Sequence, residues 1–255
     1  MPSGYTVLPL VYDRWQKSYG KDYSGLILPR VLATLKAFDV RPGTMLDLAC
    51  GTGSLALHME RRRWKVWGVD ASELMIEAAR AKVRGPRVPI RFLKQDMREL
   101  RLPERVDLTT CLFDSVNHLP GRGDLLKTFR AVAAALKPGG FFVFDTNNER
   151  CFRKLWTRDG IVRHRDFTMF FQNIYDRPHK TAYSRVTLFL KRGEVYDKAE
   201  EIVCERYFPR AVVTQLLQRA GLTVLRVEDF NFTGSREVGR IKTWWVAKRT
   251  MDNSR

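Results

Sequence analysis

Residues 47–53, with the sequence DLACGTG, combine a carboxylate with two glycines separated by one residue. Gly51 and Gly53 allow the backbone to turn tightly and to approach a ligand closely. A helix that begins just after them offers unpaired N–H groups to a carboxylate or a phosphate. A single G-x-G is equally compatible with an ordinary turn between a strand and a helix, so this segment alone identifies no ligand.

Two further carboxylates end apolar runs of the sequence. Asp70 ends the run that follows the glycine segment, where a carboxylate in a nucleotide-binding fold accepts hydrogen bonds from ribose hydroxyls. The alternative role for Asp70 is to cap the helix expected from Ser72. Asp96 and Met97 end the next run. A ligand site built from several strand ends would explain all three positions.

The elements that must position these residues alternate along the chain. Helical spacing of apolar residues alternates with short apolar runs, which predicts an α/β fold with a doubly wound, mostly parallel sheet. Ligands bind beyond the carboxyl ends of the strands in such sheets. Strands are expected at 45–49, 65–69, 90–93, 106–113 and 141–145, and helices at 24–38, 54–63, 72–83 and from an N-cap at Asp124.

The pattern changes after about residue 160. Three strands without helices between them are expected at 167–175, 181–190 and 195–207, followed by a helix from Pro209 to Gly221 and strands at 223–227 and 243–247. We interpret 161–207 as an antiparallel lid insert after the fifth strand of a single domain that spans 1–255.

Composition limits the classes of partner. The chain has 255 residues with 45 Lys or Arg against 28 Asp or Glu, a net charge of +17, which suggests an anionic partner such as nucleic acid, a phosphorylated metabolite or a membrane surface. The four cysteines form no C-x-x-C pair, and no transmembrane segment or signal peptide is evident. We expect a cytoplasmic protein with reduced thiols and no membrane partner. The oligomeric state stays open.

Five motifs in order decide between cofactors. A nicotinamide dinucleotide site requires G-x-G-x-x-G/A; here the third glycine is absent, although Ala56 is permitted. The series DLACGTG, GVDAS, QDM, CLFDSVNHL and LKPGGFFVFD within 45–146 resembles the class I S-adenosylmethionine-dependent methyltransferases. That resemblance implies a Rossmann-like sheet of seven strands, the last antiparallel, and S-adenosyl-L-methionine as cofactor.

The resemblance extends over nearly the whole chain. VYDRW and KDY within 11–23, LFDSVNHL, FDTNN and the strand-rich insert resemble a bacterial small-molecule subgroup, to which amino-sugar N-methyltransferases are similar. It implies a helical cap at 1–40 over the cofactor. The cofactor-binding residues implied are Tyr12, Tyr23, Asp47, Ala49, Gly51, Gly53, Asp70, Ala71, Met75, Asp96, Met97, Leu112 and Phe113.

The same resemblance suggests roles for individual residues. The glycine loop would hold the methionine end, with Asp47 at its ammonium, Asp70 at the ribose, Met75 against the adenine and Asp96 at the adenine amino group. Tyr12 and Tyr23 would close the N-terminal helix, and Leu112 and Phe113 would line the methionyl side. For the two tyrosines, ordinary packing is the alternative.

His118 is the candidate catalytic base, because a nucleophile that loses a proton on methylation benefits from a base with a pKa near 7. A structural role for His118 remains the alternative. Asp114 is expected to hold a substrate ammonium or hydroxyl, and Asp145 and Asn147 are expected to face the acceptor. Asp114 with Asp145 also resembles a metal-dependent O-methyltransferase arrangement, but the rest of the chain resembles the metal-free subgroup better, so we expect no metal.

Nucleic-acid variants of the reaction leave signatures that can be checked. A DNA amino-methyltransferase would carry [DNS]-P-P-[YF] at the position where residues 113–116 read FDSV. A cytosine-C5 enzyme needs a nucleophilic thiol, and Cys111 does not suit this role because it lies within an expected strand. An RNA methyltransferase and a non-catalytic cofactor-binding module remain alternatives. The leading prediction is methyl transfer to N or O of a small metabolite. Five cations of the insert could face an acidic acceptor, with a generally basic surface as the alternative: Arg163, Arg165, Arg177, Lys180 and Arg185.

Overall fold

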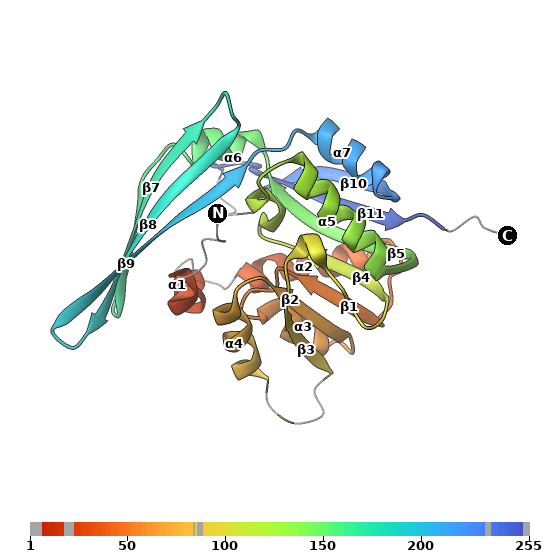
Figure 1. Ribbon diagram of the computed structural model, residues 1–255, viewed down its shortest axis with the longest axis horizontal. Coiled ribbons are helices and arrows are strands. Elements are labelled where there is room, and N and C mark those ends of the chain that lie inside the picture. The colour runs from red at the N-terminus through yellow and green to blue at the C-terminus, as the bar shows by residue number, and fades with distance from the viewer. Residues whose placement is uncertain (1–6, 18–22, 84, 86–88, 233–235, 252–255) are drawn as a thin grey trace.

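The computed structural model describes residues 7–17, 23–83, 85, 89–232 and 236–251. Its main sheet has seven strands in the order β10-β11-β5-β4-β1-β2-β3 (Figure 1). β11 is antiparallel to both of its neighbours, while the pairs among β1 to β5 are parallel. The predicted seven-stranded α/β sheet with an antiparallel last strand is therefore confirmed. The strands are β1 (Thr44–Leu48), β2 (Lys65–Asp70), β3 (Ile90–Lys94), β4 (Val106–Cys111), β5 (Leu136–Asn147), β10 (Leu222–Phe230) and β11 (Lys242–Arg249).

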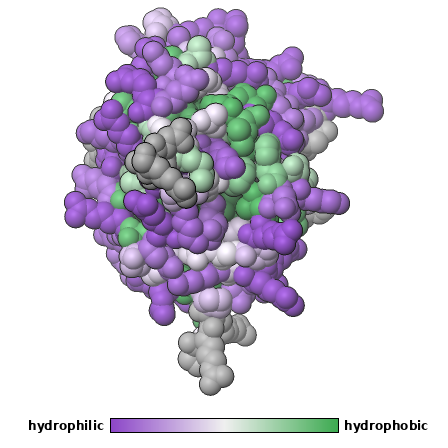
Figure 2. All heavy atoms as spheres, turned by 90° about the vertical axis from the view of Figure 1, so that its right-hand side faces the viewer, coloured by the Kyte–Doolittle hydropathy of each residue, from purple (hydrophilic) through white to green (hydrophobic). Residues whose placement is uncertain are grey.

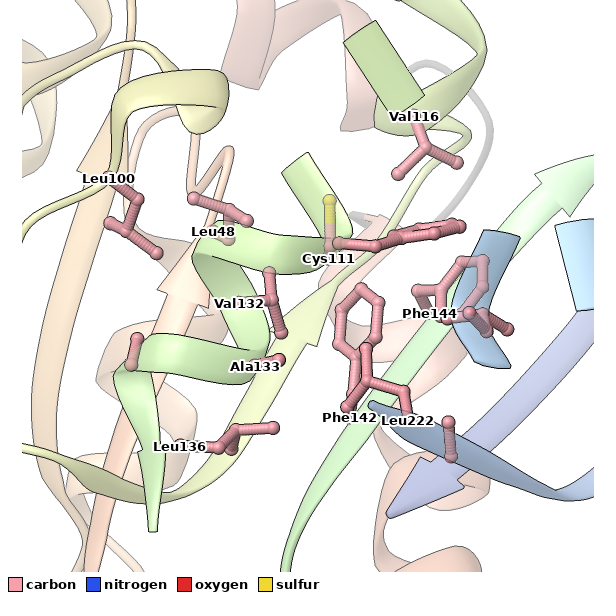
Figure 3. Packing of buried hydrophobic residues seen from close by; sticks show 14 of the residues in the cluster. Leu48, Leu100, Cys111, Val116, Val132, Ala133, Leu136, Phe142, Phe144 and Leu222 are labelled. Carbon is pink, nitrogen blue, oxygen red and sulfur yellow. The ribbon is translucent and has the colours of Figure 1, made fainter. Parts of the chain in front are cut away.

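Two apolar layers cover the faces of this sheet. One layer joins the sheet to α5 and α7, and Figure 3 shows part of it, with Val132 and Ala133 of α5 beside Phe142 of β5. The other joins the opposite face to α2, α3 and α4. The helices are α1 (Tyr12–Lys17), α2 (Tyr23–Ala37), α3 (Ser54–Glu60), α4 (Glu73–Lys82), α5 (Arg122–Ala135), α6 (Glu149–Lys154) and α7 (Arg210–Arg219), with 3-10 turns η1 (Leu8–Leu10), η2 (Met97–Glu99) and η3 (Ser115–His118).

The starts of α4 and α5 bear on two capping assignments made from the sequence, of which the cap at Asp70 was the alternative role of that residue. The Ser72 side chain caps α4 by accepting from the Met75 amide at 3.5 Å, so the cap is not Asp70. α5 begins at Arg122, with Gly121 at its N-cap position and Asp124 inside the first turn. Asp124 there complements the positive end of the helix dipole. α6 was not predicted, because six residues are too few to show helical periodicity.

The insert forms a second, antiparallel sheet of four strands in the order β6-β7-β8-β9. Its inner face carries Phe167, Met169, Val186 and Leu188, which pack against Val7, Leu8 and Val11 of the N-terminal segment. The sequence predicted three of the four strands; the short edge strand β6 was missed. The strands are β6 (Gly160–His164), β7 (Phe167–Asp176), β8 (Thr181–Arg192) and β9 (Val195–Arg206).

The N-terminal segment connects the insert sheet to the main domain. The Glu201 carboxylate of β9 accepts hydrogen bonds from the amides of Val7 and Leu8, at 3.0 and 3.1 Å. α1 follows and lies between the two sheets (Figure 1). Residues 1–6 and 18–22 of the expected cap lie outside the described residues.

Hydrophilic residues cover most of one face of the molecule. Figure 2 shows a face on which hydrophilic residues surround a smaller hydrophobic area. Among the helices of the described residues, even the longest, α2, lacks the length and apolar character needed to cross a bilayer.

Candidate functional site

A cavity of about 500 Å³ opens at the carboxyl ends of β1, β2 and β4. This is the edge where doubly wound sheets bind ligands, and the volume lies in the range of small-molecule pockets. Most of the residues predicted to form the site line this cavity. They are Tyr12, Ala49, Gly51, Asp70, Ala71, Met75, Asp96, Met97, Leu112, Phe113 and His118.

The glycine loop places its two glycines in different surroundings. Gly51 has φ +52° and lines the cavity. Gly53 has φ +74° but is not part of the cavity wall; a Cβ there would lie 2.7 Å from the Phe92 ring and 3.0 Å from Ala79 Cβ. Gly53 therefore allows α3 and α4 to pack closely against β3, in contrast to the expectation that it holds the cofactor.

Asp70 anchors the glycine loop to the next strand. Its two carboxyl oxygens accept from the amides of Gly51 and Ser72, each at 2.9 Å. Burial raises the pKa of Asp70, while these amides act in the opposite direction. A carboxylate offers about four acceptor positions, so Asp70 can accept a further hydrogen bond from a ligand even with the Ala71 amide also directed at it.

Asp47 lies directly behind the loop and does not line the cavity. Its side chain is buried, and Oδ1 accepts from the Thr110 hydroxyl at 2.9 Å. Oδ2 is buried and makes no close hydrogen bond among the described residues, although the Ala56 amide lies near enough to favour the ionised carboxylate. Burial raises the pKa of Asp47 to about 7. A buried carboxyl oxygen with unused capacity fits a cationic group, such as an ammonium, reached directly or through a water.

The wall beyond β3 combines apolar and charged groups. Asp96 caps η2, and Arg98 binds its carboxylate through Nε at 2.9 Å and Nη2 at 2.5 Å. This hydrogen bonding holds the pKa of Asp96 below its ordinary value. Arg98 also reaches Asp124 at 3.2 Å and lines the cavity. The sequence analysis did not identify Arg98, although its position two residues after Asp96 allows this two-pronged hydrogen bonding to the carboxylate.

The N-terminal segment covers the loop from the other side. Asp13 of α1 accepts from the Thr52 hydroxyl at 2.6 Å and pairs with Lys82 at 2.6 Å. Tyr12 thereby reaches the cavity wall, together with the buried Gln16, which was not predicted. Tyr23 is not part of the wall; its ring stacks on Phe113 with centroids 5.3 Å apart.

His118 ends η3 and lies on the cavity wall. Its Nδ1 is 3.1 Å from the backbone carbonyl of Cys204 in β9. Because a carbonyl only accepts, Nδ1 carries the proton and neutral His118 keeps a lone pair on Nε2. Nε2 lies 3.8 Å from Glu205 Oε1. Burial lowers the pKa of His118, and Asp114 acts in the opposite direction.

The loop that carries His118 has an unusual backbone. Phe113 and Asp114 are both left-handed, with φ of 61° and 56°. Such consecutive values in residues other than glycine are strained and must be held by the surroundings. Asp145 supplies this restraint, since it accepts from the amides of Phe113 and Asp114 at 2.6 and 3.1 Å.

Asp114, Asp145 and Asn147 form a polar cluster behind the wall, in which the Asp114 side chain is 18% exposed and the other two residues are buried. Lys242 of β11 lies 2.5 Å from Asp114 and 2.7 Å from Asp145, and Asn147 donates to Asp114 at 2.8 Å. Asp145 and Asn147 are 1% and 4% exposed and neither lines the cavity. The expectation that they face the acceptor is thus not met, because internal donors and acceptors already occupy both side chains.

Lys242 and Glu205 complete this cluster and were missed in the sequence. Although burial acts against ionisation, Asp114 and Asp145 raise the pKa of Lys242. Asp114, His118 and Glu205 have ligand-type atoms within 4.8 Å of one another. Lys242 and Asn147 already bind the two oxygens of Asp114, so this donor set suits a proton-sharing cluster better than a cation.

The cations of the insert do not face the cavity. All five are exposed and none lines the wall, which favours the generally basic surface over cations that meet an acidic acceptor there. The strand alternation directs Arg163 and Arg185 to the outer face, while Arg165, Arg177 and Lys180 lie in turns. Cys111 is fully buried, as expected for a structural thiol, and burial raises its pKa.

Comparison with known proteins agrees with this geometry. Residues 45–140 match the family described as "Methyltransferase domain". YqeM of Bacillus subtilis (strain 168), named as a methyltransferase, is 31% identical over 75% of this chain and 78% of its own length. The dTDP-3-amino-3,6-dideoxy-alpha-D-glucopyranose N,N-dimethyltransferase of Streptomyces fradiae is 30% identical, and the match covers 53% of this chain and 51% of that enzyme.

A solved structure extends the similarity to the whole fold. The S-adenosylmethionine-dependent methyltransferase from Clostridium acetobutylicum ATCC 824 superposes with a TM-score of 0.75 at 25% identity, covering 89% of this chain and 91% of that one. Sequence, fold and site together place this chain in the family of S-adenosylmethionine-dependent methyltransferases.

Proposed function

We propose that this enzyme transfers a methyl group to the nitrogen of a small-molecule amine. The observation that carries the proposal is His118, a neutral imidazole on the cavity wall with its Nδ1–H held by the Cys204 carbonyl. An amine that is protonated in water must lose a proton before it can attack, and a second proton leaves after methylation. Because burial lowers the pKa of His118, its imidazole is unprotonated near neutral pH and Nε2 can accept a proton.

The amine class is further supported by the charge around the base. The carboxyl groups of Asp114 and Glu205 lie near His118, with Lys242 as the nearby cation, and the cations of the insert lie outside the cavity. Such an environment favours an ammonium over an anion. The Streptomyces fradiae relative is named for methylating an amino sugar, which makes amino sugars a reasonable first set of acceptors.

We assign the cofactor to the cavity wall by the chemistry of each residue. Asp70 would accept from the ribose hydroxyls, Asp47 would attract the methionyl ammonium, and Met75 with Asp96 would contact the adenine. S-adenosylmethionine supplies an activated methyl group on a sulfonium. The protein then contributes orientation of the acceptor, an effect worth up to ~7–11 kcal/mol in favourable systems.

We further propose that the insert sheet forms one wall of the acceptor pocket. Three consecutive residues of β9 contact the catalytic region: the Cys204 carbonyl, the Glu205 carboxyl and the Arg206 carbonyl. α1 and the segment before it would close the cofactor side, because Asp13 holds α1 against the glycine loop.

Isotope transfer tests the proposal. The enzyme is incubated with S-adenosylmethionine carrying a deuterated methyl group and with matched amines, alcohols and carboxylates built on one sugar. Mass spectrometry should find the label on the amine only. Label on the alcohol alone would reject nitrogen as the accepting atom.

Variants of His118 test the base. His118→Ala should lower kcat by about 10²- to 10⁴-fold, the range of general-base catalysis, with S-adenosylhomocysteine affinity unchanged. Activity of His118→Ala close to that of the native enzyme at every pH would show that His118 is structural.

RNA methylation is the second candidate, because exposed cations cover the outer face and turns of the insert. It predicts RNA binding that weakens steeply with salt. Salt-independent or undetectable RNA binding by filter retention would remove this candidate.

A further inference from the structure

Glu205 brings a carboxyl group from the insert sheet into the buried cluster of the main domain. It is 4% exposed and lies near the end of β9. The Asn147 side-chain amide donates one hydrogen to Glu205 Oε2 at 2.7 Å and the other to Asp114 Oδ2 at 2.8 Å. A single nitrogen therefore holds the two carboxyl groups side by side.

Only one of these two carboxyl groups has a cation at close range. Lys242 binds Asp114 at 2.5 Å and Asp145 at 2.7 Å, and no Lys or Arg of the described residues pairs with Glu205. Two adjacent buried carboxyls do not both ionise without a large cost. Asp114 keeps its charge through Lys242, so Glu205 is the group that retains a proton.

The titration behaviour of the pair agrees with this geometry. Burial raises the pKa of Glu205 well above its ordinary value, and the charge of Asp114 and a hydrogen bond to it act in the same direction. For Asp114, burial acts upward, but Lys242 outweighs it and holds the pKa below the ordinary value. Burial raises the pKa of Asp145, while Lys242 and the Phe113 amide favour its charged form.

We propose that Glu205 is a positioning residue that works as a neutral acid, donating a hydrogen bond to Asp114 and leaving the cluster with one net negative charge beside His118. Asp114 and Asp145 each contribute one negative charge, and Lys242 contributes one positive charge. The inference rests on the proposed amine acceptor. As the amine nitrogen bonds to the methyl carbon, the carbon–sulfur bond breaks and the proton of the nitrogen passes to His118 Nε2. The single negative charge stabilises the imidazolium that results.

The groups that interact with Glu205 come from several elements, including the buried thiol of Cys151 in α6, which stays neutral because burial raises its pKa well above the ordinary value. Asp114 and His118 come from the loop after β4, Asn147 from β5 and Lys242 from β11. The charge on the cluster is therefore set by Lys242 and by the proton on Glu205. A substitution that preserves the neutral hydrogen-bonding group should preserve the behaviour of His118.

Amide substitution separates a neutral Glu205 from an ionised one. Glu205→Gln keeps a neutral donor, so the pKa of His118 and the pH profile of kcat should stay close to those of the native enzyme. Glu205→Ala removes the donor and should lower kcat by about tenfold or more, the effect of losing a hydrogen bond to a charged group. Lys242→Met removes the positive charge and should raise the pKa of His118. Glu200→Gln, an exposed substitution on the same strand, should change neither quantity.

The pKa of His118 is measured by ¹⁵N NMR titration with S-adenosylhomocysteine bound. The chain has 4 histidines, and His118→Asn assigns the signal. This readout requires no methyl acceptor, so it tests the inference even if the acceptor is not an amine. Loss of activity in Glu205→Gln as severe as in Glu205→Ala, with thermal midpoint and S-adenosylhomocysteine affinity retained, would overturn the inference and indicate an ionised Glu205. So would a shifted His118 pKa in Glu205→Gln.

Discussion

Alanine at the two glycines of the loop should separate folding from cofactor binding. Both glycines have positive φ, so alanine at either position costs about 1–2 kcal/mol in backbone strain. At Gly53 the added Cβ also meets Phe92 at 2.7 Å and Ala79 Cβ at 3.0 Å. Ala79 is fixed to the backbone of α4 and cannot rotate away. At Gly51 the nearest atom is Cε1 of Tyr12 at 3.7 Å, an ordinary contact.

The two substitutions therefore differ by the cost of overpacking, which is typically about 1–3 kcal/mol. Gly53→Ala should lower the free energy of unfolding by about 2–5 kcal/mol and Gly51→Ala by about 1–2 kcal/mol. For cofactor binding the order reverses, because Gly51 lines the cavity and Gly53 does not. Gly51→Ala should weaken S-adenosylhomocysteine binding more than Gly53→Ala.

Urea denaturation gives the unfolding free energies, and isothermal titration calorimetry of the folded variants gives the affinities. Equal losses of unfolding free energy in the two variants would show that overpacking at Gly53 does not destabilise the fold. A greater loss of affinity in Gly53→Ala, with its fold intact, would place the cofactor against Gly53 instead.

Three carboxylates give further tests. Asp47 is buried with a pKa of about 7 against an ordinary value near 3.8, so the folded protein binds its proton more tightly than the unfolded chain and loses stability as the pH rises toward 7. Asp47→Asn should therefore raise the thermal midpoint at pH 8, with an advantage that shrinks toward pH 4; a gain independent of pH would contradict this sign. Asp70→Ala removes the acceptor of the Gly51 and Ser72 amides and should weaken S-adenosylhomocysteine binding about tenfold or more, whereas unchanged calorimetric affinity would reject the site. Asp13→Ala removes the contacts of α1 to Thr52 and Lys82. It should speed S-adenosylhomocysteine release in stopped-flow measurements, and an unchanged release rate would mean that α1 does not restrain the cofactor.

The main sheet could be predicted because its strands are buried on both faces and are bounded by glycine, proline and acidic residues. The strand-end residues of the cavity wall, such as Asp70 and Asp96, followed from the same pattern, since a parallel sheet gathers the ends of distant strands. Tyr12 and Met75 were instead implied by the resemblance to methyltransferases. The short elements β6 and α6 left too few residues for a period to show. Gly53 was assigned to the cofactor from its place in the glycine loop. The sequence does not show that the Phe92 ring of β3, far along the chain, packs against it.

Charged residues far apart in the sequence were harder to assign. Lys242 stands in an apolar run with Trp244 and Trp245, which is a signal for a buried pair, but the run does not reveal that the partner is Asp114. The outward direction of Arg185 could have been predicted from the sequence, because Val186 and Leu188 define the inner face of β8 by alternation. The inward direction of Glu205 follows from the same alternation, because Glu205 lies two residues after the inward-facing Val203 on β9.

The β8–β9 hairpin has one fixed end and one open end. Near the reaction, Cys204, Glu205 and Arg206 are each held by a residue of the main domain. At the other end, the turn at Gly193 projects away from the body of the molecule (Figure 1). Inserting one residue into β9 would direct Glu205 to the opposite face, whereas adding a pair of residues at the tip would leave the inner end in phase. The length of this hairpin can thus change at its tip in steps of two residues without turning Cys204, Glu205 and Arg206 away from the main domain.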